Sequence, residues 1–166
     1  MSDSFDFTDA RAVVPGAVGE PGRRTFFVQV HATTGILSFK VEKQQVAALC
    51  EYFESVLGDL PGSDPLEPPT PPDVLEPTSM IWTVGGLGVA WEPDDDRLLI
   101  VAEELLTDDE VTDDSREPAT ARFHLTPAQV KVFMHLGNEL VHAGRPGCRL
   151  CGRPIDADGH TCPRLN

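Results

Sequence analysis

Hydrophobic and polar residues follow one period over the first predicted strands and another immediately after them. Residues 25–30 and 36–41 alternate roughly between the two kinds and are rich in β-branched and aromatic residues. With Thr33-Thr34-Gly35 between them, these segments predict an antiparallel hairpin. From Glu42 to about Leu57 apolar residues recur every three or four positions, which predicts an amphipathic helix. Its apolar stripe contains Val46, Leu49, Cys50, Phe53, Val56 and Leu57.

The second half of the chain shows the same kind of pattern. Thr126 and Pro127 suit the N-cap and first position of a helix that runs to about His142 and stops before Gly144 and Pro146. Upstream of this helix the sequence predicts four strands, with a turn at three consecutive aspartates. The strands are 80–84, joined through Gly85-Gly86 to 87–91, then 97–106 after the turn at 94–96, and 121–125.

Three other segments are predicted to hold no long regular element. Residues 1–24 contain a short alternating piece, Phe5-Asp6-Phe7, and then a stretch rich in Gly and Pro. Residues 59–78 contain seven prolines, which predicts an exposed, polyproline-like loop or linker. A recruitment site for a proline-reading domain would have the same composition. Residues 107–118 are acidic and are predicted to form a mobile loop.

Two segments that lie 84 residues apart align without gaps. Residues 39–46 and 123–130 both place Phe, then Val or Leu, then Gln-Val, at a strand-to-helix junction. The pattern predicts an α+β fold in which two antiparallel meander-plus-helix units share one core. Chance similarity between two ordinary junctions is the alternative to a true duplication. The predicted boundaries are 1–143 for the duplicated domain, with halves 5–58 and 79–143 and the Pro-rich linker 59–78, and 144–166 for a separate tail.

Charge is distributed unevenly along the chain, whose formal net charge is −14. Residues 1–141 hold 9 Lys and Arg against 25 Asp and Glu, a net charge of −16, whereas residues 142–166 have a net charge of +2. An acidic body repels phosphate backbones and anionic lipids, which argues against nucleic acid and membranes as partners. No secretion signal or membrane span is visible, so we expect a cytoplasmic protein.

The tail carries the clearest chemical motif, with the spacing C-x2-C-x8-H-x-C. Cys148, Cys151, His160 and Cys162 supply three thiolates and one imidazole, which complete a closed tetrahedral zinc site. Such a site has no open coordination position, so the predicted Zn²⁺ is structural. The tail has few large apolar residues and is not expected to fold without the metal.

Other interpretations of these cysteines stay open. The tail is alternatively an unstructured reduced segment, a redox pair at Cys148 and Cys151, or part of an iron–sulfur site. Cys50 lies inside the apolar stripe of its helix and is predicted to be a small buried hydrophobe.

Signatures of common enzymes are missing from the sequence. It contains no P-loop, no G-x-G-x-x-G after a strand and no G-x-S-x-G elbow. His135, Glu139 and His142 share one helix face and are interpreted as surface residues rather than a second metal site. His31 and His124 lie in predicted strands without an evident acid–base partner. No catalytic residue is therefore assigned.

Three stretches together resemble a known family. They are Pro21-Gly22-Arg23-Arg24-Thr25-Phe26-Phe27, the run Glu42-Lys43-Gln44-Gln45-Val46, and the tail from Gly147 to Arg164. They resemble an uncharacterised actinobacterial family, domain of unknown function 3090, over essentially the whole chain. The resemblance implies a cytoplasmic bacterial protein and supports a metal-binding tail. It implies no substrate and no activity.

These observations favour a non-catalytic, zinc-binding interaction or adaptor protein. Its tail would dock an unidentified protein partner through Arg149, Arg153 and Arg164. The first alternative is a single-stranded nucleic-acid-binding protein, suggested by the outline of two meander-plus-helix units and by the basic tail. The second alternative is an enzyme with a site between the two halves, for which no residue selects a reaction.

Overall fold

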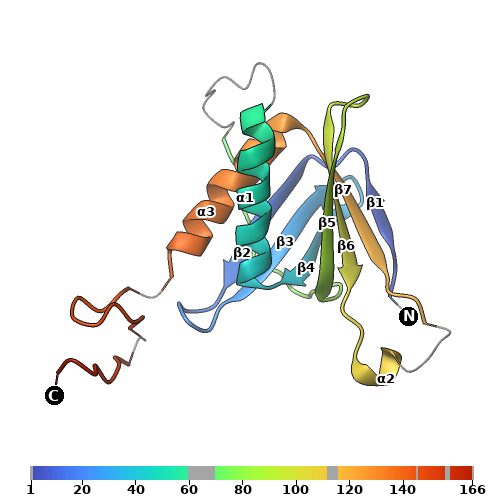
Figure 1. Cartoon of the computed structure of the whole chain (residues 1–166). Helices are drawn as coiled ribbons and strands as arrows, with labels where there is room; N and C mark the ends of the chain where they lie inside the picture. The colour runs from blue at the N-terminus through green and yellow to red at the C-terminus, as the bar shows by residue number, and fades with distance from the viewer. Residues whose placement is uncertain (1, 60–69, 112–115, 145, 156–157, 166) are drawn as a thin grey trace.

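In the computed structural model, two three-stranded antiparallel meanders are each followed by a long helix (Figure 1). The structure describes residues 2–59, 70–111, 116–144, 146–155 and 158–165. The first unit consists of β2 (Ala12–Val18), β3 (Thr25–Ala32), β4 (Gly35–Val41) and α1 (Lys43–Asp59). The second consists of β5 (Val84–Glu92), β6 (Arg97–Glu104), β7 (Thr120–Leu125) and α3 (Pro127–His142). This arrangement confirms the predicted α+β fold of two meander-plus-helix units.

Two shorter elements complete the chain order. β1 (Phe5–Phe7) pairs in parallel with β7, so the second sheet has the order β1-β7-β6-β5, while the first has the order β2-β3-β4. α2 (Asp108–Val111) is a four-residue helix in the acidic segment that was predicted as a loop. Arg116 binds both Glu104 and Glu110, at 3.2 and 2.8 Å, and so fastens α2 to the end of β6. Residues 112–115 lie outside the described part of the chain.

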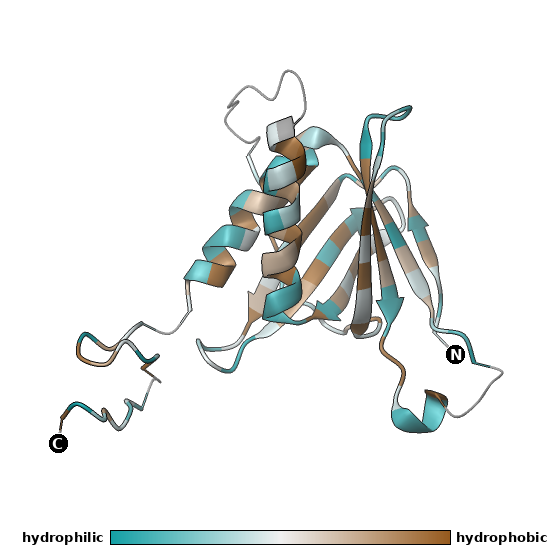
Figure 2. Cartoon of the chain, viewed as in Figure 1, coloured by the Kyte–Doolittle hydropathy of each residue, from teal (hydrophilic) through white to brown (hydrophobic). Residues whose placement is uncertain are grey.

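Aromatic side chains from both sheets meet in one core. Phe39 of β4 and Phe123 of β7 pack edge to face, with ring centroids 5.6 Å apart. Phe7 and Trp82 add further edge contacts to Phe39, at 6.3 and 4.8 Å. In Figure 2 the hydrophobic residues gather on the sheet and helix surfaces that face one another. Burial of these rings makes the two units depend on each other for their stability.

The two long helices lie against each other in this core. Phe53 of α1 and Phe133 of α3 form an edge-to-face pair with centroids 5.4 Å apart. Gly137 of α3 lies so close to α1 that a Cβ placed on it would be 2.4 Å from the sulfur of Cys50. Cys50 is 2% exposed, which confirms that it is a buried small residue.

Each long helix has an equivalent glutamine as its third residue. Gln129 accepts a hydrogen bond from the Thr126 amide (2.9 Å), and Thr126 Oγ1 accepts one from the Gln129 amide (3.1 Å), which forms a capping box. Gln45 accepts the Glu42 amide at 2.8 Å in the same way. The free NH₂ groups of these glutamines reach the carbonyls of Ala10 (2.8 Å) and Val84 (3.3 Å). Each glutamine therefore ties its helix to the start of the other unit.

Two strand predictions were wrong. β2 was not predicted as a strand, and it runs through the stretch that was described only as rich in Gly and Pro. The predicted break at Gly85-Gly86 is not a turn, because β5 continues through it with only a shift in its register to β6. Of the predicted strand 80–84, only Val84 lies in β5, and Thr83 forms a single bridge to Lys40.

The described end of the Pro-rich segment lies across the outer face of the first sheet. Residues 70–78 have no regular secondary structure, as predicted, whereas residues 60–69 lie outside the described part. The side-chain amide of Gln29 accepts a bond from the Leu75 amide (3.0 Å) and donates one to the Leu75 carbonyl (2.9 Å). Within the described residues, no helix is long and apolar enough to cross a membrane.

Candidate metal centre

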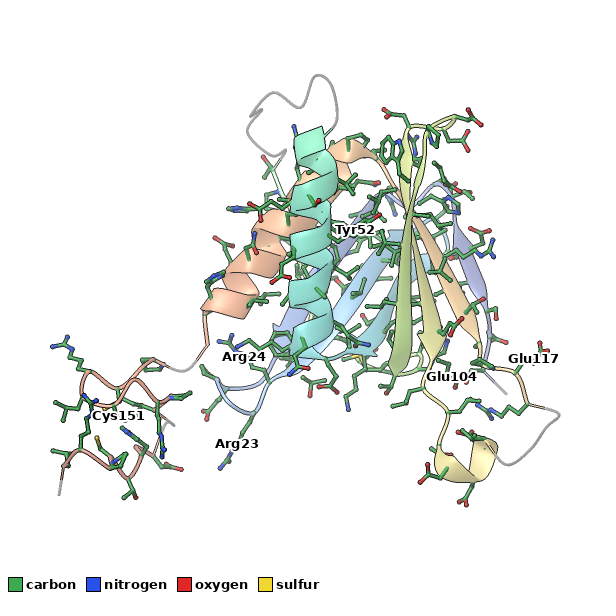
Figure 3. The ribbon with its side chains drawn as sticks, viewed as in Figure 1. Arg23, Arg24, Tyr52, Glu104, Glu117 and Cys151 are labelled. Atoms are coloured by element: carbon green, nitrogen blue, oxygen red, sulfur yellow. The ribbon has the colours of Figure 1, made fainter. Side chains whose placement is uncertain are left out.

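The chain leaves α3 at its C-terminal end and folds into a small tail beside the body, where Figure 3 labels Cys151. A short antiparallel bridge joins Gly147 and Pro154, and the Cys148 amide donates to the Arg153 carbonyl at 2.8 Å. The Gly152 amide donates to the Cys148 carbonyl, also at 2.8 Å. Gly152 has φ +74, a left-handed conformation that costs glycine little and lets the chain reverse directly after the second cysteine.

The four predicted ligands come together in this tail. One ligand atom from each of Cys148, Cys151, His160 and Cys162 lies within 4.8 Å of all the others. The sulfurs of Cys148 and Cys162 are 3.9 Å apart, and the Cys151 sulfur is 3.3 Å from His160 Nε2. Two thiolates bound to one tetrahedral Zn²⁺ at about 2.3 Å stand about 3.8 Å apart. The group could therefore hold a metal ion, and its donor set suits Zn²⁺.

Hydrogen bonds from the backbone act on the first sulfur of the group. The amides of Cys151 and Leu150 donate to the Cys148 sulfur, the latter at 3.4 Å, and they lower the pKa of that thiol. Because a metal binds the thiolate, these amides favour the form that acts as a ligand.

The Cys162 sulfur is in a different environment. The Arg164 amide lowers the pKa of the Cys162 thiol, but burial and the sulfurs of Cys151 and Cys148 outweigh it and raise the pKa. Several thiolates placed side by side repel one another, which disfavours their ionisation. A bound divalent cation would offset this repulsion.

Further contacts hold the second half of the tail against the first. Gly159 has φ +88 directly before His160, and Cys162 is 5% exposed. Arg164 Nη1 donates to the Leu150 carbonyl at 3.0 Å, so this arginine links the two ends of the tail. Arg149 and Arg153 are exposed. Of the three predicted contact residues, these two therefore offer the freer side chains.

Other residues considered as ligands lie elsewhere. Cys50 is buried between the helices. His135 pairs with Glu139 (3.7 Å) and His142 bonds the Asn138 carbonyl (2.7 Å), so these side chains do not converge on one point. The metal ligands that were predicted from spacing are thus the only Cys/His group of this kind among the described residues.

No partner for His124 was predicted from the sequence, but in the structure this side chain has two. Its Nδ1 lies 3.0 Å from Glu92 and its Nε2 lies 2.9 Å from Asp6, which links β7 to β5 and β1. The alternating pattern marked His124 as lying on a strand face. Its carboxylate partners come from positions 32 and 118 residues away, which no local pattern shows.

Comparison with known families agrees with the whole-chain resemblance. The family described as protein of unknown function (DUF3090) matches residues 5–162, which include both units and all four clustered side chains. The chain belongs to this family. No curated protein and no solved structure matches it. The family assignment therefore brings no activity with it, and function has to be argued from the site.

Proposed function

We propose that this protein is a non-catalytic, zinc-binding interaction protein. Its C-terminal centre binds one structural Zn²⁺ and presents arginines to a partner with an acidic surface. The observation that carries the proposal is the convergence of Cys148, Cys151, His160 and Cys162 within 4.8 Å. Three thiolates and one imidazole fill all four positions of a tetrahedral ion and leave none for substrate or water.

Charge supports the choice of partner. The tail is basic and stands on a body of net charge −16. Arg149 and Arg153 are exposed, and each lies within two residues of Cys148 or Cys151, which would fix their backbone on binding a metal. Guanidinium groups bind carboxylates through paired hydrogen bonds, so an acidic protein segment is the partner that this tail would recognise.

The first experiment is metal analysis of the full chain, purified under reducing conditions without added metal. We expect one equivalent of zinc per chain, reduced to a small fraction in Cys162→Ser. Cys50→Ser is the matched control and should keep its zinc, since Cys50 is buried far from the tail. A chain without bound metal, or Cys162→Ser with full zinc, would refute the proposal.

The second experiment tests docking by affinity capture from the native cell with identification by mass spectrometry. We expect the double variant Arg149→Glu/Arg153→Glu to lose a partner that the wild type captures. The control Arg23→Glu changes the same kind of charge on the body and should keep that partner. Retention of the partner by the tail variant would contradict the docking role.

The nucleic-acid alternative makes the opposite prediction for a gel shift. A labelled single strand at low salt should not shift, because the acidic body repels phosphates. A salt-dependent shift that Arg149→Ala and Arg153→Ala abolish would favour this alternative. The enzyme alternative would be favoured by a pocket lined by His31 or His124. The pocket of about 530 Å³ that β2, α3 and residues 74–76 form is lined by neither histidine.

A further inference from the structure

A second candidate site lies on the body, away from the tail cysteines. The end of β2, the C-terminal half of α3 and residues 74–76 border an open cleft of about 530 Å³. Sites for small molecules usually have volumes of about 300–1,000 Å³ and mainly apolar walls. The walls here include Phe27, Val74 and Leu140. The cleft therefore has the size and the lining of a small-molecule site.

The walls of this cleft are fixed in place. Gln29 is 1% exposed, and its amide makes both a donated and an accepted hydrogen bond with the backbone of Leu75, as a neighbouring strand would. Gly16 allows Phe27 and Val74 to pack closely against the β2 backbone, because a Cβ there would lie 2.4 Å from the Phe27 ring and 2.6 Å from Val74. A preformed site loses little conformational entropy when it binds a ligand.

The two units differ where the cleft opens. The strand pairing allows the two units to be aligned, with Phe39 and Phe123 as equivalent core positions. In this alignment Ala17 in β2 and Trp91 in β5 are also equivalent. Both pack partly buried against the core. Where the second unit has an indole, the first has a single methyl group, and Ala17 lines the cleft. The cleft thus depends on a small residue at this position.

Positive charge stands at one end of the cleft. Arg24 lines it and also lines an adjoining space of about 190 Å³, together with Lys43 and Gly144. Among the described residues, neither Arg24 nor Lys43 forms an ion pair. Figure 3 shows Arg24 near the lower ends of the two helices, whereas Arg23 extends away from the body. Two unpaired cations in so acidic a body suggest an anionic ligand.

Two carboxylates also border the cleft, and they limit what it accepts. Glu139 pairs with His135 at 3.7 Å, and Glu76 is exposed. Their charge disfavours a ligand that is anionic along its whole length. An apolar body with a single anionic end, directed at Arg24, avoids that repulsion.

We propose that this cleft binds a small amphipathic anion. The apolar part of the ligand fills the space between β2, α3 and residues 74–76, and its carboxylate or phosphate group binds Arg24 at the end that Lys43 shares. The proposal does not depend on the zinc centre, and each can fail without the other.

The test is isothermal titration of the full chain, as purified under reducing conditions, with decanoate and with decyl phosphate. We expect saturable binding of one equivalent of at least one of them. Arg24→Gln should raise its Kd by about tenfold or more, the usual effect of losing a charged hydrogen bond. Arg23→Gln is the matched control, one residue away and outside both clefts, and should leave the Kd unchanged.

The outcomes separate the possible occupants. Binding of decanoate alone would assign a carboxylate head group, and binding of decyl phosphate alone a phosphate. Binding of inorganic phosphate as tightly as decyl phosphate, or equal loss in both arginine variants, would overturn the proposal. The proposal would also be overturned if neither decanoate nor decyl phosphate bound. A concentration-dependent dimer that Arg24→Gln disrupts, without ligand binding, would assign the cleft to a second copy and also overturn it.

Placement of the ligand needs a second measurement. In methyl-labelled protein, added ligand should shift the resonances of Val74 and Leu140 in the cleft. The methyl groups of Val111, on the far α2 segment, should stay unchanged. Shifts spread over the whole protein, with none concentrated at the cleft, would contradict the assignment even if binding were tight.

Discussion

Gly137 lets α3 lie against α1 because it has a hydrogen where every other residue has a Cβ. A Cβ there would meet the Cys50 sulfur at 2.4 Å, with Val46 Cγ1 at 3.4 Å and Pro15 Cγ at 3.7 Å. Since Cys50 is 2% exposed, its sulfur cannot turn out to solvent to avoid this contact. Alanine favours a helix over glycine by about 1 kcal/mol, whereas overpacking a core costs about 1–3 kcal/mol. Packing should outweigh propensity at this position.

We predict that Gly137→Ala lowers the free energy of unfolding by about 1 kcal/mol or more, measured by urea denaturation. Gly58→Ala is the control, because nothing lies within 4 Å of a Cβ at that helical glycine. It should raise stability by about 0.5–1 kcal/mol. In a Cys50→Ala background the cost of Gly137→Ala should disappear, and persistence of that cost would show that the contact is not its cause.

Because Cys50 is buried at the same contact, its contribution to the free energy of unfolding depends on pH. Burial, with a smaller contribution from Glu51, raises the pKa of this thiol from 9.0 to about 11. The folded chain therefore keeps a proton that the unfolded chain loses between these values. Stability from this group is fully present below pH 9 and should fall as the pH rises toward about 11.

We predict that wild type loses more stability than Cys50→Ala between pH 8.5 and 10.5 (a range of about two units around the shift) in paired urea titrations. At pH 8, iodoacetamide should modify the tail cysteines of metal-free protein and leave Cys50 unmodified until the body unfolds. Rapid labelling of Cys50 in the folded chain would contradict its burial.

At the scale of elements, local signals were sufficient for the two long helices but missed the short helix α2 and the strand β2. α3 was predicted to its cap, because Thr126, Pro127 and a 3.6-residue period all act within a few residues. β2 was missed because both of its faces are covered. Val13 enters the main core while Ala12 and Val14 pack with Val132 of α3, which removes the alternation. Burial by a helix over 100 residues away leaves no local trace.

The candidate metal centre and the cleft differ in the same way in how far the sequence predicts them. Four ligands within 15 residues carry their geometry in their spacing, so the sequence was enough to bring them together. The cleft is made by β2, α3 and residues 74–76, which only the tertiary fold assembles. The glutamines near the helix starts were predictable only in part. The alignment showed them as repeated residues, whereas their bonds to the other unit appear only in the structure.

We predict that Gln129→Ala destabilises the protein by about 1–2 kcal/mol, since it removes half of a capping box and leaves the Ala10 carbonyl without its donor. Gln45→Ala should cost less, because its bonds to Val84 and Gly85 are longer, at 3.3 and 3.4 Å. Thermal and urea unfolding of both variants measures the difference. Equal costs would mean that the links between the units contribute nothing beyond the helix caps.

At the scale of the whole molecule, two parts have different sources of stability. The body buries a continuous core that includes Phe39, Phe53, Phe123 and Phe133. In the described part of the tail a short bridge joins Gly147 and Pro154, and the large apolar side chains Leu150 and Leu165 are exposed. We therefore expect that a segment of this size without a core needs a metal to hold one conformation. The shared origin of the two units stays a prediction, since similar meanders also arise independently.

This difference predicts how the chain responds to metal removal. In reducing buffer, a chelator should make the tail after His142 sensitive to limited trypsin digestion at Arg149, which precedes Leu150, whereas Arg153 precedes Pro154 and is not a trypsin site. Residues up to about the end of α3 should persist as one resistant fragment with an unchanged urea midpoint. Added zinc should restore protection in wild type but not in Cys162→Ser, because only wild type retains all four ligands. If chelation instead lowers the midpoint of the body, the metal supports the main core, and the tail is an integral part of the fold. If the tail stays protected without metal, its own contacts suffice to hold it, and the role proposed here for zinc is wrong.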